Sequence, residues 1–184
     1  MNVKQTATYE DLLKVPEDKV AEIVEGELYA SPRPRTRHAH VGALLTAELV
    51  DAFHTGRRGP AGWWILYEPE LHLGSDILVP DLAGWRRETL PMMHDVPALD
   101  IAPDWACEIL SPSTVDLDLH RKLPAYARHQ VSWLWLIDPG AKTLEVFRRE
   151  SDGWTRLGSH RESDRVHAEP FDAVEIDLSP LWLK

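Results

Sequence analysis

The chain has very little cysteine: Cys107 is the single one among 184 residues. One cysteine cannot form a disulfide within the chain, and it cannot build a cysteine-rich zinc site. It lies between Ala106 and Glu108 in a segment predicted to be a strand, and no signature of a catalytic thiol accompanies it. We therefore expect Cys107 to be a small, buried, apolar side chain.

Long apolar runs are also missing. No stretch approaches the roughly 20 apolar residues that a membrane-spanning helix needs, and residues 1–19 lack the basic-then-apolar pattern of a signal peptide. The composition, 43% hydrophobic and 27% charged, is typical of a compact soluble protein. No internal repeat interrupts the chain, so we expect one cytoplasmic domain over residues 1–184, with no membrane contact.

Basic residues are fewer than acidic ones. The 20 lysines and arginines against 30 acidic residues give a formal net charge of -10. Proteins that hold nucleic acid mainly through a basic face need clustered Lys and Arg, so the charge argues against that mode of binding. Local basic patches can still form at residues 33–38, 57–58 and 86–87.

Hydrophobic periodicity predicts helices among β-hairpins. Apolar residues from His38 to His54 recur at three- and four-residue spacing, which is typical of an amphipathic helix. A second helical pattern, over residues 119–127, contains Pro124, so this helix either begins near the proline or bends there. A hairpin is predicted around Glu25-Gly26. Further strands are expected at 63–73 and 77–85, paired as a hairpin, and at 104–110, 132–139, 143–150 and 154–160. The result is an α/β class with a mixed sheet, in which 104–110 is central.

Two carboxylates interrupt these apolar segments. Asp81 and Glu108 have apolar neighbours on both sides, and a buried carboxylate without a partner costs about several kcal/mol, so each needs a cation, a donor or a proton. Carboxylates from adjacent strands can hold Mg²⁺, which prefers oxygen ligands. The ion acidifies water and neutralises phosphate charge, and Lys122 could position the water or stabilise the transition state.

Six motifs occur in order along the chain. They are AEIVEGELY at 21–29, His38 at the start of a helix, VPD at 79–81, EILSPST at 108–114, Asp118 with Lys122 and Tyr126, and WLWLIDP at 133–139. In this series the chain resembles the Uma-two family of proposed bacterial endonucleases, long classed as a domain of unknown function, within the PD-(D/E)XK superfamily. The resemblance covers most of the chain. It implies a restriction-endonuclease-like mixed β-sheet core flanked by helices, with additional antiparallel hairpins.

The resemblance also implies residue roles. Asp81 and Glu108 would be metal ligands, with the carbonyl of Ile109 as a third. The superfamily's lysine usually stands two residues after the acid, where this chain has Leu110. In families of this kind the lysine has moved to the following helix, and Lys122 is the residue that matches.

Four further residues match less specific positions of the motifs. Glu22 corresponds to an acidic residue near the metal, which implies an indirect or water-mediated ligand. His38, Asp118 and Tyr126 are additional candidates for the site. The function implied is a Mg²⁺-dependent endonuclease that cleaves DNA as a homodimer, with Mn²⁺ able to substitute.

Each candidate also has an ordinary structural interpretation. Asp81 after a proline is a common turn residue. Lys122 could be an exposed helix lysine paired with Asp118 four residues earlier. His38 and His40 form an HxH pair that could suggest zinc, but no cysteine supports it, and histidines at the start of a helix are often solvated.

The paired tryptophans and Ser111 also have ordinary structural explanations. Trp133 and Trp135 share one face of a strand, and core packing or a subunit interface is a better explanation than base stacking. Ser111 lacks the G-x-S-x-G elbow, so a turn into the helix explains it better than a nucleophile. The acidic charge and Leu110 favour an alternative function, a non-catalytic nucleic-acid- or protein-binding module that retains the fold. Hydrolysis of another phosphoester stays open.

Overall fold

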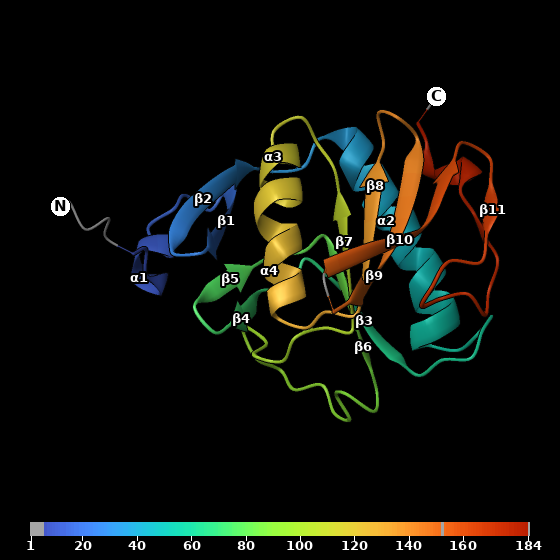
Figure 1. Ribbon diagram of the computed structural model, residues 1–184, viewed down its shortest axis with the longest axis horizontal. Coiled ribbons are helices and arrows are strands. Elements are labelled where there is room, and N and C mark those ends of the chain that lie inside the picture. Colours follow the sequence, from blue (N-terminus) through green and yellow to red (C-terminus); the bar gives the residue numbers. More distant parts are fainter. Residues whose placement is uncertain (1–5, 152, 184) are drawn as a thin grey trace.

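A six-stranded mixed sheet forms the centre of the protein (Figure 1), for which a computed structural model describes residues 6–151 and 153–183. The strand order is β10-β9-β8-β7-β6-β3. The strands are β3 (Trp63–Tyr67), β6 (Leu82–Arg86), β7 (Trp105–Ile109), β8 (Trp133–Asp138), β9 (Thr143–Glu150) and β10 (Gly153–Arg161). β7 and β8 are parallel, and the other pairs are antiparallel. The predicted α/β class, the mixed sheet and the interior position of β7 are confirmed.

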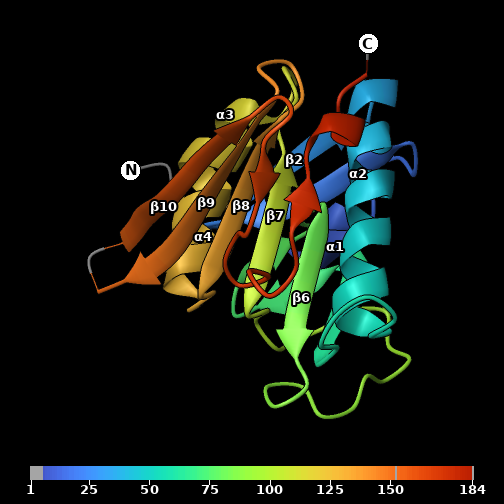
Figure 2. The same cartoon turned by 90° about the vertical axis from the view of Figure 1, so that its right-hand side faces the viewer.

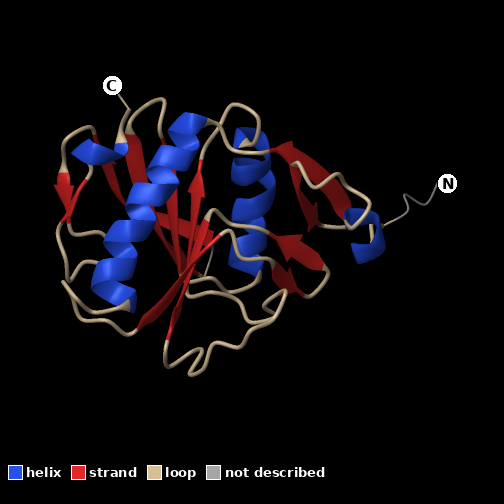
Figure 3. Cartoon of the chain, turned by 180° about the vertical axis from the view of Figure 1, so that it is seen from behind, coloured by secondary structure: helices blue, strands red, loops and turns tan. Residues whose placement is uncertain are grey.

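Helical segments cover both faces of this sheet (Figure 2). On one face lies α2 (Thr36–Leu49), which continues into the π-helical turn η1 (Val50–His54) and crosses the strands (Figure 3). This agrees with the predicted helix to within two residues. On the other face lie α3 (Val115–Leu117), η2 (Asp118–Lys122) and α4 (Leu123–Arg128). In the described residues no helix combines the length and apolar character needed to cross a membrane.

The second helical segment is continuous through Pro124. It begins at Val115 rather than near the proline, so the first of the two predicted alternatives is wrong. Pro124 has no N–H to donate to the carbonyl one turn earlier, and the wide π-helical turn of η2 lies immediately before α4. Lys122 is therefore within the helical segment, on the side that packs against the sheets.

A second sheet of four short strands lies beside this helical segment (Figure 1). Its order is β2-β1-β5-β4, with β1 (Lys19–Val24), β2 (Glu27–Pro32), β4 (Leu71–Leu73) and β5 (Asp76–Leu78). The β1–β2 hairpin turns at Glu25 and Gly26, whose φ angles are 53° and 77°, as predicted. The short helix α1 (Tyr9–Leu12) begins with a capping box between Thr8 and Asp11 and packs on β1.

The predicted long strands at 63–73 and 77–85 are wrong, although their pairing is right. Each arm is broken: β3 pairs with β6 in the central sheet, whereas β4 pairs with β5 in the small one. Pro69 and Pro80 lie at the breaks, and neither has an N–H for a strand ladder. Asp81 consequently lies in the bend between β5 and β6, not inside a strand.

The core on the α2 face is rich in aromatic side chains. Trp105 and Trp135 are fully buried, and their rings pack edge to face with 5.3 Å between the ring centroids. Phe171 packs against both rings. The chain's last elements, β11 (Arg165–Val166), β12 (Ile176–Asp177) and η3 (Ser179–Leu181), contribute to the same cluster. Cys107 is buried there, as predicted, and packing is the role of Trp135.

Candidate active site

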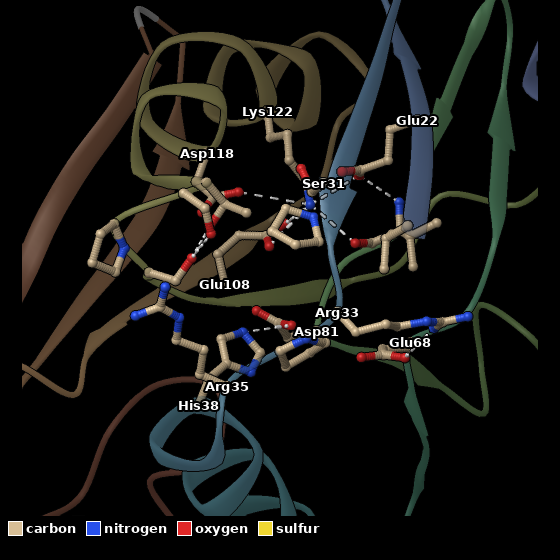
Figure 4. Close-up of a pocket in the computed structure, with 18 residues that line it drawn as sticks. Glu22, Ser31, Arg33, Arg35, His38, Glu68, Asp81, Glu108, Asp118 and Lys122 are labelled. Atoms are coloured by element: carbon tan, nitrogen blue, oxygen red, sulfur yellow. Dashed lines mark hydrogen bonds and ion pairs between the residues drawn. The ribbon is translucent and has the colours of Figure 1, made fainter. Parts of the chain in front are cut away.

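Most of the predicted site residues line one pocket of about 380 Å³ (Figure 4). Ile109 and Tyr126 do not line it, but Ile109 donates its N–H to Asp81 and Tyr126 donates its hydroxyl to Glu108. Its walls come from β1, the start of α2, the bends after β3 and β5, the end of β7, the loop that follows β7, and η2. Five carboxylates line it: Glu22, Glu68, Asp81, Glu108 and Asp118. His38 and Lys122 line it as well. The bends place acids from distant parts of the sequence at a single corner.

Lys122 lies at the centre of this cluster. Its Nζ is 2.9 Å from Glu22 Oε1 and 2.9 Å from Glu108 Oε1, and it donates a 3.0 Å hydrogen bond to the carbonyl of Val79. Asp118 Oδ1 is more distant, at 3.9 Å. Because the side chain is only 3% exposed, the interpretation of Lys122 as a solvated partner of Asp118 is wrong.

The charge of Lys122 follows from these contacts. Burial alone would lower its pKa, but the carboxylates of Glu108 and Glu22 outweigh burial and hold the pKa well above its usual range. Glu22 is itself fixed, because the backbone N–H of Val79 donates to its Oε1 at 2.7 Å. The lysine is therefore an ammonium group held in place by two strands of different sheets.

Glu108 has partners for both of its oxygens. Tyr126 donates its hydroxyl to Oε1 at 2.5 Å, and Lys122 contacts both oxygens. Burial, together with the neighbouring carboxylates, raises the pKa of Glu108 well above its ordinary value. Burial and the charge of Glu108 raise the pKa of Tyr126 in the same way, so Tyr126 remains a donor. These partners offset the cost of burying the Glu108 carboxylate inside an apolar strand.

Asp81 links two strands and a helix. Its Oδ2 accepts the backbone N–H of Ile109 at 2.6 Å, and its Oδ1 is 3.0 Å from His38 Nε2. Burial alone would lower the pKa of His38, but Asp81 outweighs it and raises the pKa. The Nδ1 atom of His38 is buried without a hydrogen-bond partner among the described residues. His40 instead bonds the carbonyl of Pro180 at 3.0 Å, so the two histidines do not form a zinc pair.

The donor set of the pocket fits a hard divalent cation. Among the described residues, no group of three or more His, Cys, Asp and Glu side chains is placed to share one ion. Mg²⁺ does not require such a group, since it is usually bound by one or two carboxylates together with water and substrate phosphates. Asp81 and Glu108 both line the pocket, so two carboxylates of the required type are present there. Burial raises the pKa of Asp118 to about 6, as expected where acids outnumber cations.

Comparison with known proteins agrees with the motifs. A model of the Uma2 family, described as "Putative restriction endonuclease", matches residues 6–179. The chain belongs to this family. A solved structure from Anabaena variabilis ATCC 29413, described as a "putative nuclease belonging to DUF820", is similar at a TM-score of 0.75 with 23% identity, over 96% of this chain and 97% of that one. It confirms the fold. No curated protein matches the chain.

The motifs of this Uma2-family chain did not indicate every residue of the pocket. The sequence does not single out Glu68, because the apolar alternation predicts one continuous strand over residues 63–73. Its N–H donates to the carbonyl of Asp81 at 3.0 Å, so the two acids meet at the corner where both chain segments break. Proline beside each acid was the available signal: Pro69 follows Glu68, and Pro80 precedes Asp81.

The rim of the pocket carries residues with less specific sequence signals. Arg33 and Arg35 line it, and Arg33 lies 3.9 Å from Glu68.

Ser111 shares hydrogen bonds of 2.9 Å with Ser113 and Thr114 in the turn before α3. This geometry supports the turn, rather than the nucleophile, as the role of Ser111.

Proposed function

We propose that this Uma2-family protein is a Mg²⁺-dependent endonuclease that cleaves phosphodiester bonds in DNA. The observation that carries the proposal is that Asp81 from the bend between β5 and β6, Glu108 from β7 and Lys122 from η2 line one pocket. The family description and the nuclease described for the similar structure support the same reaction class.

Asp81, Glu108 and the carbonyl of Ile109 would hold the ion. Bound there, Mg²⁺ would lower the pKa of a coordinated water and neutralise charge on the phosphate. Each carboxylate oxygen can accept more than one interaction, so the existing contacts of Asp81 and Glu108 leave capacity for a ligand. Mn²⁺ has similar preferences and would substitute.

Lys122 has the properties of an electrostatic stabiliser. Because it is held as an ammonium group by Glu22 and Glu108, it would place positive charge beside the reacting phosphate rather than accept a proton from water. Tyr126 and His38 position the two acids, Tyr126 through Glu108 and His38 through Asp81. Preorganised groups of this kind need little rearrangement during the reaction.

The alternative is a binding module that has the nuclease fold without cleavage. Two observations favour it: Lys122 is already paired with Glu22 and Glu108 at 2.9 Å, and the net charge is -10. Under this alternative the ammonium group would take the place of the ion in a purely structural site.

Incubation of the purified protein with plasmid DNA and Mg²⁺ or Mn²⁺ tests the proposal. We expect nicking by the wild-type protein and a loss of at least about 100-fold in Asp81→Asn and Glu108→Gln. Glu88→Gln is the control, since Glu88 is exposed and outside the pocket. Thermal unfolding would verify that each variant is folded. Equal nicking by all four proteins would mean that the activity belongs to a contaminant or to another site, and no nicking by any of them would favour the binding module.

A further inference from the structure

A second pocket adjoins the acidic one. Its volume is about 470 Å³, and it shares Arg35, His38, Ser111 and Pro112 with the first pocket. A group that occupies it is therefore separated from the acidic pocket by a single layer of side chains. A chain molecule that is cut at Asp81 and Glu108 and runs along the start of α2 would pass this opening on one side of the cut.

The wall of the second pocket is largely apolar. Leu110, Val115 and Pro139 line it beyond the shared residues. Asp138 is also present, but its Oδ1 accepts the N–H groups of Gly140 and Ala141 at 2.7 and 2.9 Å. The carboxylate is thus engaged by the turn that follows β8. An apolar concave wall of this kind suits the face of a nucleobase.

The mouth of this pocket is basic. Arg35 and Arg37 are exposed, and neither has a side-chain hydrogen bond or an ion pair within the part of the chain that the structure describes. Arg33, two residues earlier, is by contrast close to Glu68. The first turn of α2 contains no acidic residue. In a protein with a net charge of -10, two arginines without acidic partners at one opening suit a phosphate group.

We propose that the second pocket receives the base of the nucleotide adjoining the cleaved phosphate, so that the substrate is a DNA strand in which this nucleotide is unpaired. The inference rests on the proposed function. A base inside a duplex is stacked on both sides and can enter a concave pocket only by leaving the stack. A single strand, or a locally unpaired site, presents the base without that cost.

The charge of the molecule favours the same substrate. A protein that holds a long duplex neutralises many phosphates with a basic face. Here the basic groups at the mouth are Arg35 and Arg37, whereas the neighbouring pocket is lined by five carboxylates. Contact with one or two phosphates and one base is the mode of binding that these groups can support.

Fluorescence anisotropy with a short labelled DNA strand, alone and annealed to its complement, tests the proposal in EDTA, where cleavage does not occur. We expect the single strand to bind about tenfold more tightly than the duplex, the effect of one base contact. Val115→Trp, which fills the pocket, should abolish the preference. Arg37→Glu should weaken single-strand binding about tenfold.

Arg57→Glu is the matched control, because Arg57 is exposed, lies outside both pockets and undergoes the same change of charge. It should change single-strand affinity less than about twofold. An equal loss in Arg57→Glu and Arg37→Glu would overturn the proposal, since net charge alone would then explain binding. So would equal affinity for the two DNA forms, or no binding to either. If Val115→Trp fails to fold, Arg37→Glu still decides between these results.

This assay and the plasmid assay can fail separately. Preferential binding to the single strand that Val115→Trp removes supports the pocket assignment even where no plasmid is nicked, which contradicts only the nuclease proposal. Plasmid nicking that depends on Asp81 together with equal affinity for both DNA forms overturns only the pocket assignment.

Discussion

Lys122 connects the two sheets at the site. It contacts Glu22 from the small sheet, Glu108 from the central sheet and the carbonyl of Val79 between the two. A lysine with 3% exposure costs more to bury than most side chains, and only paired carboxylates make that burial tolerable. The ion-pair cluster is therefore a structural element as well as a candidate catalytic one.

Replacement of Lys122 by methionine should destabilise the fold. The methionine fills a similar volume but leaves Glu22 and Glu108 buried without a cation, and removal of one partner of a buried pair costs about 3–5 kcal/mol. Urea denaturation at neutral pH would measure the loss in free energy of unfolding. Lys14→Met is the control, since Lys14 and Asp11 form an exposed pair that contributes about 0–1 kcal/mol. An unchanged free energy in Lys122→Met would mean that the cluster does not need its cation.

The sequence indicated the residues of the site better than their contacts. Glu108 was found because a carboxylate inside an apolar strand requires a partner, and Lys122 because it follows at the family's spacing. That Lys122 is buried could not be predicted, because residues four apart share a helix face whether that face is solvated or packed. Tyr126, one turn further on, was a candidate through its motif position, but the sequence did not indicate that its hydroxyl donates to Glu108.

At the scale of elements, the corner between the two sheets creates the site. Periodicity predicted the pairing of residues 63–73 with 77–85, because apolar alternation continues through both arms. It could not show that the arms split between two sheets, since the split depends on the packing of β4 and β5 against β1 and α4. Prolines at both breaks were present in the sequence, but proline is compatible with edge strands as well as with bends.

Asp76 connects the elements of this corner. It is 2% exposed and accepts from the N–H of Glu25 at 2.8 Å, from Arg128 at 2.8 Å and from His129 at 2.7 Å. Burial alone would raise its pKa, but the bonds from Arg128, Glu25 and His129 outweigh burial and lower the pKa below its ordinary value. This carboxylate ties β5 to the β1–β2 turn and to the end of α4.

The lowered pKa of Asp76 predicts a pH dependence. A group whose folded pKa is lower than its unfolded value, about 3.9, stabilises the protein fully above that value, and the contribution is lost as the pH falls through the folded pKa. Asp76→Asn should therefore be less stable than wild type at about pH 7, and the difference should be smaller at about pH 3, below the unfolded pKa. Thermal unfolding at the two pH values would measure this. A difference that grows on acidification would contradict the assignment.

Packing of the central sheet gives a further prediction. A Cβ at Gly84 in β6 would lie 3.1 Å from Ile65 Cδ1, 3.1 Å from Trp105 Cε3 and 3.3 Å from Trp63 Cε3. Overpacking of this kind costs about 1–3 kcal/mol, so Gly84→Ala should lower the free energy of unfolding by that amount in urea denaturation. A neutral or stabilising effect would show that the neighbouring aromatic side chains can shift to make room for the Cβ without a loss in free energy of unfolding.

For the whole molecule, charge decides how DNA binding should respond to salt. For a complex with a single strand, the slope of log K (the association constant) against the logarithm of the salt concentration is about -0.7 for each phosphate neutralised. If Arg35 and Arg37 supply the contacts, the slope should be near -1.4, and Arg37→Ala should halve it, whereas Arg57→Ala should leave it unchanged. Anisotropy titrations over a range of KCl concentrations would measure the three slopes. A slope steeper than about -4 would require a basic face that a chain of net charge -10 forms elsewhere, and would move the DNA path away from α2.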